Sequence, residues 1–337
     1  FTLGHETTYT LSENIYGESK EFPLDNLGVD NLGLGAVPSS VTSSKSDSRR
    51  LSFFARAFYS YADKYMLTAT VRADASSVFS ENHKWGCFPS FSGAWNMANE
   101  DWLKDVSWIS NMKIRAGWGM VGNDRITNYL SLDLYNSAKY GLGASQVTTL
   151  YPAHLANKDL KWEASATTNV GVDLGFFEDR LNITADAFLK DSNDLLLSQD
   201  LTYVTGFSSQ WQNIGKIRNK GLEISLKTIN VDKKNFSWST DFNISFIDNE
   251  LISLLDGTDY MQVRSNFNSN NTNNDYIAVV GEPLGNMYGF VFDGVYQYSD
   301  FVVTPDGDMS LKKGVPDPTS HLGQKPYPGF VKYKDIN

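Results

Sequence analysis

Histidine and cysteine are the residues of this chain that most directly suggest chemistry, because both bind metals and take part in catalysis. A zinc site takes three or four such ligands at close spacing. The four histidines and the single cysteine are instead scattered along the 337 residues: His5, His83, His154, His321 and Cys87. We therefore predict surface roles for the histidines and no zinc or haem site, and we interpret the lone thiol as a small apolar residue.

Paired carboxylates are the second chemical feature. Two acids that flank a sugar can hydrolyse a glycosidic bond, and Asp191 and Asp194 are close in the sequence. They follow the end of a predicted strand, which favours a loop turn or a place on the rim of a pore. No G-x-S-x-G, phosphate-loop or dinucleotide motif occurs in the sequence. We predict that the protein is not an enzyme.

Alternate acidic residues near the end of the chain resemble fragments of calcium-binding loops, in which carboxylates at every second position converge on one ion. Asp306 and Asp308 flank Gly307, where a plain turn is the favoured interpretation. Asp335 and Asn337 are the candidates for a metal site. Neither group is a complete loop. Calcium is therefore expected only in an intact, longer protein, and no other cofactor is expected.

Aromatic residues are abundant, with 17 Tyr and 8 Trp. Such rings form belts at both interfaces of an outer-membrane barrel. Trp85, Trp162 and Trp211 lie in or near predicted loops and are the candidates for stacking on a substrate, with interface or packing roles as the favoured alternative. The other substrate-binding residues stay open.

The charge of the chain narrows the class of ligand. A formal net charge of -10 and the lack of a basic stripe exclude nucleic-acid binding, because phosphate contacts need clustered Lys and Arg. Carboxylates and tyrosines on the predicted loops favour a polar ligand that is uncharged or cationic.

Apolar residues alternate with polar ones over much of the chain, which predicts β-strands with one apolar face. Tyr65, Leu67 and Val71, for example, alternate with Thr68 and Arg72. The same period occurs in further segments: 51–61, 87–97, 112–119, 169–176, 181–190, 222–227 and 238–246. We predict an all-β fold of about nine antiparallel strands that are long enough to cross a membrane.

The predicted connections fall into a short and a long class that alternate along the chain. The short ones are 62–64, 177–180 and 229–235, with a moderate one at 98–111, and the long ones are 13–49, 76–86, 120–164, 193–212 and 249–337. Short periplasmic turns and long extracellular loops are typical of an outer-membrane β-barrel. The sequence has no run of 18 apolar residues. Its first residues do not form a signal peptide, and we interpret this start as a cut.

Several ordered motifs make the chain resemble the SusC/RagA family of TonB-dependent outer-membrane transporters from Bacteroidetes. The matching segments are 64–65 (KY), 72–79 (RADASSVF), 85–90 (WGCFPS), 113–119 (KIRAGWG), 122–123 (GN), 157–163 (NKDLKWE), 186–191 (DAFLKD), 205–207 (TGF) and 213–223 (NIGKIRNKGLE). They span nearly the whole chain. Ala75 stands where the family usually has Gly, and Phe188 where it usually has Tyr.

The resemblance implies an antiparallel transmembrane β-barrel of about 22 strands, in the outer membrane of a Gram-negative, Bacteroidetes-type bacterium. Residues 1–337 then form part of one barrel domain, without the plug domain and the C-terminal end of the barrel, and 249–337 form an extended extracellular loop region. It also implies a SusD-like surface lipoprotein and the TonB-ExbB-ExbD complex as partners, with oligosaccharides or peptides as substrates.

Three functions follow from these patterns. The first is active import through a barrel whose wall lies in outer-membrane lipid and does no chemistry on the substrate. The second is a soluble carbohydrate-binding β-sandwich, which predicts a fragment that is monomeric without detergent. The third is a surface adhesion barrel that binds without transport, which the absence of an upstream plug would favour.

Overall fold

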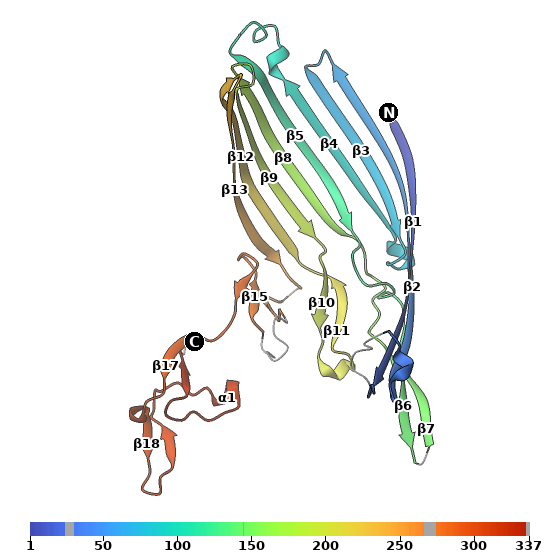
Figure 1. Cartoon of the computed structure of the whole chain (residues 1–337), viewed down its shortest axis with the longest axis vertical. Helices are drawn as coiled ribbons and strands as arrows, with labels where there is room; N and C mark the ends of the chain where they lie inside the picture. The colour runs from blue at the N-terminus through green and yellow to red at the C-terminus, as the bar shows by residue number, and fades with distance from the viewer. Residues whose placement is uncertain (24–29, 144, 256, 266–273, 335–337) are drawn as a thin grey trace. The chain divides into compact units, whose positions relative to one another are not determined.

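The computed structural model describes residues 1–23, 30–143, 145–255, 257–265 and 274–334 (Figure 1). The chain forms two compact units. The first comprises residues Phe1–Thr258 and Val280–Glu282, and the second comprises Asp259–Val279 and Pro283–Asn337.

The first unit is built on one antiparallel sheet of nine strands, in which each strand pairs with the next long strand along the chain (Figure 1). In spatial order the strands are β1 (Thr2–Lys20), β2 (Val37–Tyr61), β3 (Tyr65–Ser76), β4 (Trp85–Asn96), β5 (Ile109–Asn123), β8 (Glu163–Phe176), β9 (Leu181–Asn193), β12 (Lys216–Lys233) and β13 (Phe236–Ser253). The predicted all-β fold with about nine long antiparallel strands is confirmed.

Two smaller hairpins lie within the long connections of this unit. The first hairpin pairs β6 (Tyr135–Leu142) with β7 (Ser145–Pro152). The second pairs β10 (Leu196–Asp200) with β11 (Ser209–Asn213). Neither belongs to the nine-stranded sheet, so the sheet remains a simple meander.

The alternation in the sequence corresponds to the two faces of the sheet. Ala116 on β5 pairs with Gly93 on β4 and with Val170 on β8, which places the three on one face. Arg115 pairs with Gly171 and lies on the opposite face. Because side chains alternate with period two, a slip of one residue would exchange the charged and the apolar face. The pattern therefore fixes the register of these strands.

One predicted loop is much shorter than expected. β1 and β2 continue as a paired ribbon into the predicted loop 13–49, and the connection between them is 21–36. Glu13 pairs with Lys45 in this ribbon, with 2.6 Å between Nζ and Oε1. The ribbon is largely exposed on both sides, so neither face requires apolar residues and the sequence carries no alternation there.

A compact apolar cluster lies at the end of the sheet where the long connections meet. It is formed by Val78, Phe79, Phe88, Leu130, Leu160, Trp162 and Leu196. These residues come from β4, from β10 and from three connections, so the cluster joins loops that are far apart in the sequence. Close packing of such side chains stabilises a long loop that has few backbone pairings of its own.

The second unit contains three small sheets. They are formed by β14 (Tyr260–Val263), β15 (Tyr276–Val279) and β16 (Asn286–Met287), by β17 (Phe292–Val295) with β20 (Val331–Tyr333), and by β18 (Phe301–Val303) with β19 (Met309–Leu311). Tyr296 is the buried centre of the second unit, and its hydroxyl donates to the Pro316 carbonyl at 2.5 Å. Asp306 and Gly307 form a plain turn, as predicted, in which Gly307 has a φ of 89°.

The helical content of the described residues is small. The α-helix α1 (Thr319–Leu322) has four residues. None of the helices in the described ranges has the length and apolar character that a membrane span requires.

Candidate functional site

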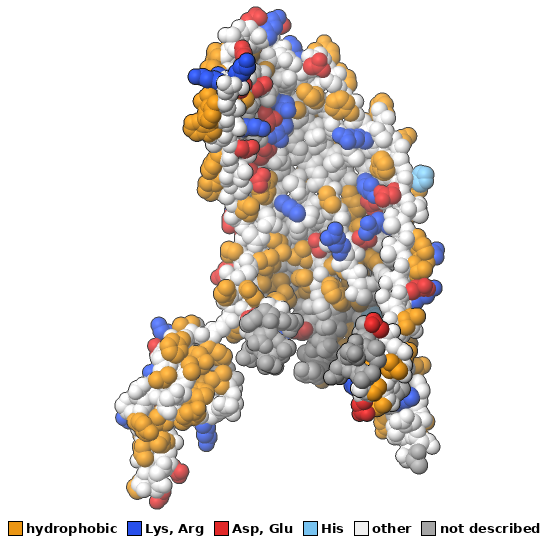
Figure 2. All heavy atoms as spheres, viewed as in Figure 1, with side chains coloured by type: hydrophobic (Ala, Val, Ile, Leu, Met, Phe, Trp, Pro, Cys, Tyr) orange, Lys and Arg blue, Asp and Glu red, His pale blue; other side chains and the backbone are white. Residues whose placement is uncertain are grey.

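One face of the sheet, called here the polar face, carries a connected set of charged side chains, part of which Figure 2 shows. Arg115 donates to Asp173 on β8 from Nε at 2.8 Å and from Nη2 at 3.0 Å. Its Nη2 also donates to Asp186 on β9 at 3.0 Å. Gly171 lies beneath this guanidinium, where an added Cβ would come within 2.8 Å of Nη2. The missing side chain lets one arginine bridge three strands.

A pocket of about 400 Å³ lies on the polar face at the end of the long connections. Arg50 on β2 pairs with Asp124, with Nε 3.3 Å from Oδ2. Arg72 on β3 pairs with Asp74, with Nε 2.8 Å from Oδ1, and reaches Glu6 on β1 at 3.1 Å. The lining also includes Phe88, Trp162, Asn123 and Arg125. This pocket, which combines arginines with aromatic rings, is the candidate binding site of the described chain.

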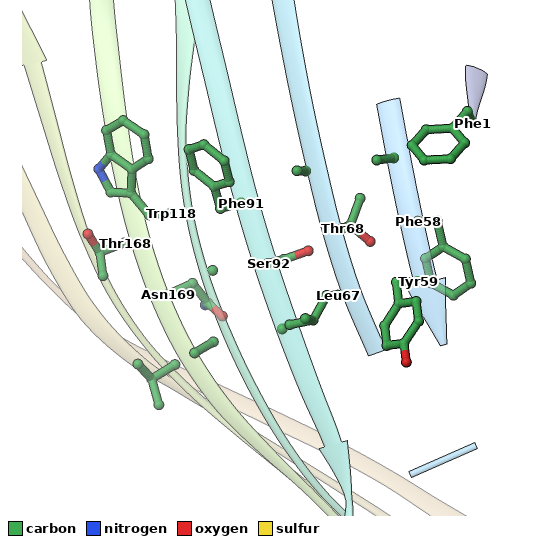
Figure 3. Close-up of a pocket in the computed structure, with 16 residues that line it drawn as sticks. Phe1, Phe58, Tyr59, Leu67, Thr68, Phe91, Ser92, Trp118, Thr168 and Asn169 are labelled. Carbon is green, nitrogen blue, oxygen red and sulfur yellow. The ribbon is translucent and has the colours of Figure 1, made fainter. Parts of the chain in front are cut away.

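The opposite face, called the apolar face, carries no charged side chain at the outward positions of β3, β4, β5 and β8, all of which are described. It contains a hollow of about 740 Å³ (Figure 3). The small residues Ala69, Gly93 and Ala116 line it together with the larger side chains Leu67, Tyr59, Phe91 and Trp118. Its chemistry fits hydrocarbon and offers no group for catalysis.

A hydrogen-bonded cluster marks the end of the sheet with the short connections. Glu100, in the connection 97–108, accepts hydrogen bonds from the Tyr65 hydroxyl at 2.7 Å, from Lys64 Nζ at 3.0 Å and from Trp95 Nε1 at 3.0 Å. The rings of Tyr65 and Trp95 stack with their centroids 6.3 Å apart. These donors, the Tyr65 hydroxyl first, lower the pKa of Glu100 from 4.5 to about 2.

We expect Glu100→Gln to remove a pH-dependent part of the stability. Because folding lowers the pKa of Glu100, its contribution is fully present above about pH 4.5 and is lost as the pH falls toward about 2. The measurement is the unfolding midpoint of the full-length protein in detergent between pH 7 and pH 2. Wild type and variant should differ at neutral pH and converge in acid, whereas Asp105→Asn, which removes an exposed carboxylate from the same connection, is the control. A difference that is constant with pH would contradict this assignment.

The three tryptophans predicted as substrate contacts lie in different surroundings. Trp85 is 55% exposed and stacks on Phe53, with centroids 6.3 Å apart. Trp162 is buried in the apolar cluster, and Trp211 packs against that cluster. Only Trp162 lines the pocket on the polar face among these three. Trp162 and Trp211 therefore meet at one apolar cluster, whereas Trp85 stacks on Phe53. A substrate contact by any of the three stays a prediction.

The candidate acids are also separate. Asp191 binds Arg218 Nε at 2.7 Å and Lys216 Nζ at 3.0 Å. Asp194 pairs with Lys161 at 3.0 Å. Each carboxylate thus has its own cation, as expected for structural ion pairs at the end of β9.

Metal binding was predicted only for Asp335 and Asn337, which lie outside the described residues. Within the described ranges no group of three or more His, Cys, Asp or Glu side chains could hold a metal ion. Cys87 pairs with Ala73 on the apolar face.

Sequence reasoning missed the pocket on the polar face. Its ion pair between Arg50 and Asp124 joins residues 74 positions apart, and no local pattern reveals such a pair. One signal was available, because Arg50 and Arg72 occupy the polar positions of their strands and Asp124 directly follows the Gly122–Asn123 motif. Charged residues at such positions next to the same set of connections indicate that Arg50, Arg72 and Asp124 lie at one end of the sheet.

The sequence of this chain is similar to the sequences of TonB-dependent receptors. The family model described as TonB dependent receptor-like, beta-barrel matches residues 1–328. TonB-dependent receptor P3 of Formosa agariphila is 36% identical over 321 residues, which cover 95% of this chain and 31% of that protein. TonB-dependent receptor SusC of Bacteroides thetaiotaomicron is 34% identical over 255 residues, which cover 73% of this chain and 25% of SusC.

Solved structures agree with the sequence comparison. The structure of the RagAB peptide transporter superposes with a TM-score of 0.77 and 25% identity, and covers 93% of this chain and 34% of the matched chain. The chain thus spans about a third of the length of the relatives that it matches. Its two-faced sheet is part of an outer-membrane barrel wall. The chain belongs to the TonB-dependent receptor β-barrel family, of the SusC/RagA type, whose members are transporters and not enzymes.

Proposed function

We propose that this chain forms part of a transporter that imports oligosaccharides or peptides actively across the outer membrane. The observation that carries the proposal is the contrast between the two faces of the sheet. Charged pairs such as Arg115 with Asp173 lie on the polar face, which in a barrel lines the interior. The apolar face and its hollow are lined mainly by apolar side chains such as Leu67, Phe91 and Trp118. Such a wall encloses a polar passage through lipid.

The partners belong to the same proposal. A SusD-like lipoprotein would cover the extracellular side, where the long connections of the sheet and the region 249–337 would lie. The TonB-ExbB-ExbD complex would supply energy through a part of the protein outside this chain. RagAB is a peptide transporter, which supports a peptide as the transported substrate. An oligosaccharide is the second substrate class of the proposal.

The test is uptake by the full-length protein in its own membrane. Cells that express it with the adjacent lipoprotein are given fluorescent oligosaccharide and oligopeptide libraries, and uptake is compared before and after a protonophore removes the energy source. We expect energy-dependent accumulation of one ligand class and its loss when the gene is deleted. Surface binding without accumulation would instead identify an adhesion barrel, and a fragment that folds as a monomer without detergent would identify a soluble binding module.

A further inference from the structure

We propose that the pocket on the polar face binds a carboxylate group of the imported substrate. This inference rests on the proposed function, because it treats the polar face as the wall of the passage. Three arginines line the pocket, Arg50, Arg72 and Arg125, against two carboxylates, Asp74 and Asp124. The lining therefore has one more arginine than carboxylates, and the partner that offsets this charge is Glu6, which is not part of the lining and lies 3.1 Å from Arg72.

The burial of the ion pairs makes the pocket more cationic than this difference suggests. The side chains of Asp124 and Asp74 are only 9% and 8% exposed, whereas their partners Arg50 and Arg72 are 48% and 37% exposed. The acids thus lie beneath the arginines and hold them in place. A solute in the pocket therefore meets the guanidinium groups of Arg50 and Arg125 before these two acids, whereas Arg72 is shared with Glu6, whose side chain is 58% exposed.

Arg50 and Arg72 each also have N–H donors that make no hydrogen bond within the described ranges. Arg50 binds Asp124 through Nε and Nη2, and Arg72 uses Nε for Asp74 and Nη2 for Ser52 and Glu6. Within the described ranges, Nη1 of both arginines makes no hydrogen bond. A guanidinium has five N–H donors in a planar fork that matches a carboxylate.

Arg125 is the residue most suited to bind the ligand directly. Its backbone N–H donates to the Asn123 side chain at 3.1 Å, which fixes the start of the side chain at the pocket edge. Its guanidinium is exposed and has no ion-pair or hydrogen-bond partner in the part of the chain that the structure describes. An ordered backbone below an unpaired guanidinium is an arrangement that a ligand can complete.

The structure thereby changes the class of ligand that the sequence favoured. Loop carboxylates favoured an uncharged or cationic ligand, but the two carboxylates that line this pocket, Asp74 and Asp124, are covered by their own arginines. A carboxylate that binds Arg125 and the free Nη1 of Arg50 or Arg72 would form charge-assisted hydrogen bonds, which are the strong ones. Peptides with a free C-terminus and oligosaccharides of uronic acids both carry this group.

The experiment compares matched ligands on the full-length transporter with its lipoprotein, purified in detergent. One pair is an oligopeptide with a free and with an amidated C-terminus, and the other is an oligogalacturonate and a neutral galacto-oligosaccharide of equal length. Dissociation constants are measured by calorimetry for the wild type, Arg125→Ala, Arg125→Lys and Lys190→Ala. Lys190 is an exposed cation on the polar face of β9 that does not line the pocket.

We expect one of the two carboxylated ligands to bind more tightly than its neutral match. Arg125→Ala should weaken that ligand about tenfold or more, because one charge-assisted hydrogen bond has that effect. Arg125→Lys should restore part of the affinity, the neutral ligands should not respond, and Lys190→Ala should change neither. The pair that shows the preference identifies the source of the carboxylate.

Two results would overturn the inference. Equal binding of charged and neutral ligands would show that the pocket does not select a carboxylate, and an equal loss in Arg125→Ala and Lys190→Ala would assign the preference to the general field of the polar face. In either case import of a neutral ligand would leave the proposed function intact. Import of none would contradict the proposed function itself.

Discussion

Replacing Trp162 by alanine should lower the free energy of unfolding by about 3–5 kcal/mol, the usual cost of removing a large buried aromatic ring. The ring is 9% exposed and lies between Phe79 and Phe88, at centroid distances of 5.4 and 5.3 Å. Its indole N–H donates to the Lys84 carbonyl at 2.9 Å. Truncation would leave a cavity and remove one of the two hydrogen bonds to the Lys84 carbonyl, which also accepts from the Ser76 N–H at 3.0 Å. The three connections would thus lose their common anchor.

The measurement is the unfolding midpoint of the full-length protein in detergent, read from heat-modified mobility on a gel and from tryptophan fluorescence. Trp85→Ala is the matched control, because Trp85 is 55% exposed and truncation at an exposed site changes stability by about 0.5 kcal/mol or less. If Trp162→Ala kept its midpoint but lost ligand affinity, the ring would be a substrate contact and not a packing residue.

The strands of the sheet could be predicted because one solvent acts on each face. A charge is unfavourable at the positions of β3 that face a membrane, whereas the positions that face the barrel interior can be polar. Leu67 and Val71 therefore alternate with Thr68 and Arg72. The same selection acts on β8 and β9. Where both faces meet water, as in the ribbon of Glu13 and Lys45, that selection is absent and the strand could not be recognised.

The candidate site could not be predicted in the same way. Its residues are contributed by β2, β3, β4 and β5 and by the connection between β5 and β8. The fold brings Arg50 to Asp124 although the two are 74 positions apart. Sequence motifs identified the family and included Arg72 and Asp74, but a motif does not say which side chain is covered. The exposed fraction of each side chain comes only from the structure: Asp124 is 9% exposed and Arg50 is 48% exposed, although both are charged.

Trp162 is a second residue whose surroundings could not be decided from the sequence alone. Its type and its position in a loop left a contact with a sugar open beside the favoured packing role, and the structure packs the ring against Phe79 and Phe88. The NKDLKWE segment positions both Leu160, fully buried, and Trp162 against the cluster. An apolar residue two positions before the ring was a local sign of packing.

Replacing Ala116 by arginine should destabilise the barrel by about 2–4 kcal/mol if the apolar face lies near the middle of the membrane. Ala116 is exposed, pairs with Gly93 and Val170, and lines the hollow in Figure 3. No carboxylate lies on the outward positions of β3, β4, β5 or β8 to pair with a new cation. The guanidinium would therefore enter hydrocarbon unpaired or distort the lipid around it.

The control is Ser92→Arg, which adds the same charge on the polar face, where Ser92 pairs with Gly117, the neighbour of Ala116. Folding yield into lipid vesicles and the urea midpoint of the folded protein are compared for both variants. Ala116→Arg should fold poorly and Ser92→Arg normally, because only the first charge loses water when the wall enters the bilayer. Equal tolerance of both would mean that water reaches the apolar face, and the sheet would then not be a membrane wall. A second check is the dependence of this cost on the depth of the residue in the membrane. Trp85→Arg, near the end of β4, should lower the free energy of unfolding by only about 0–1 kcal/mol through its charge.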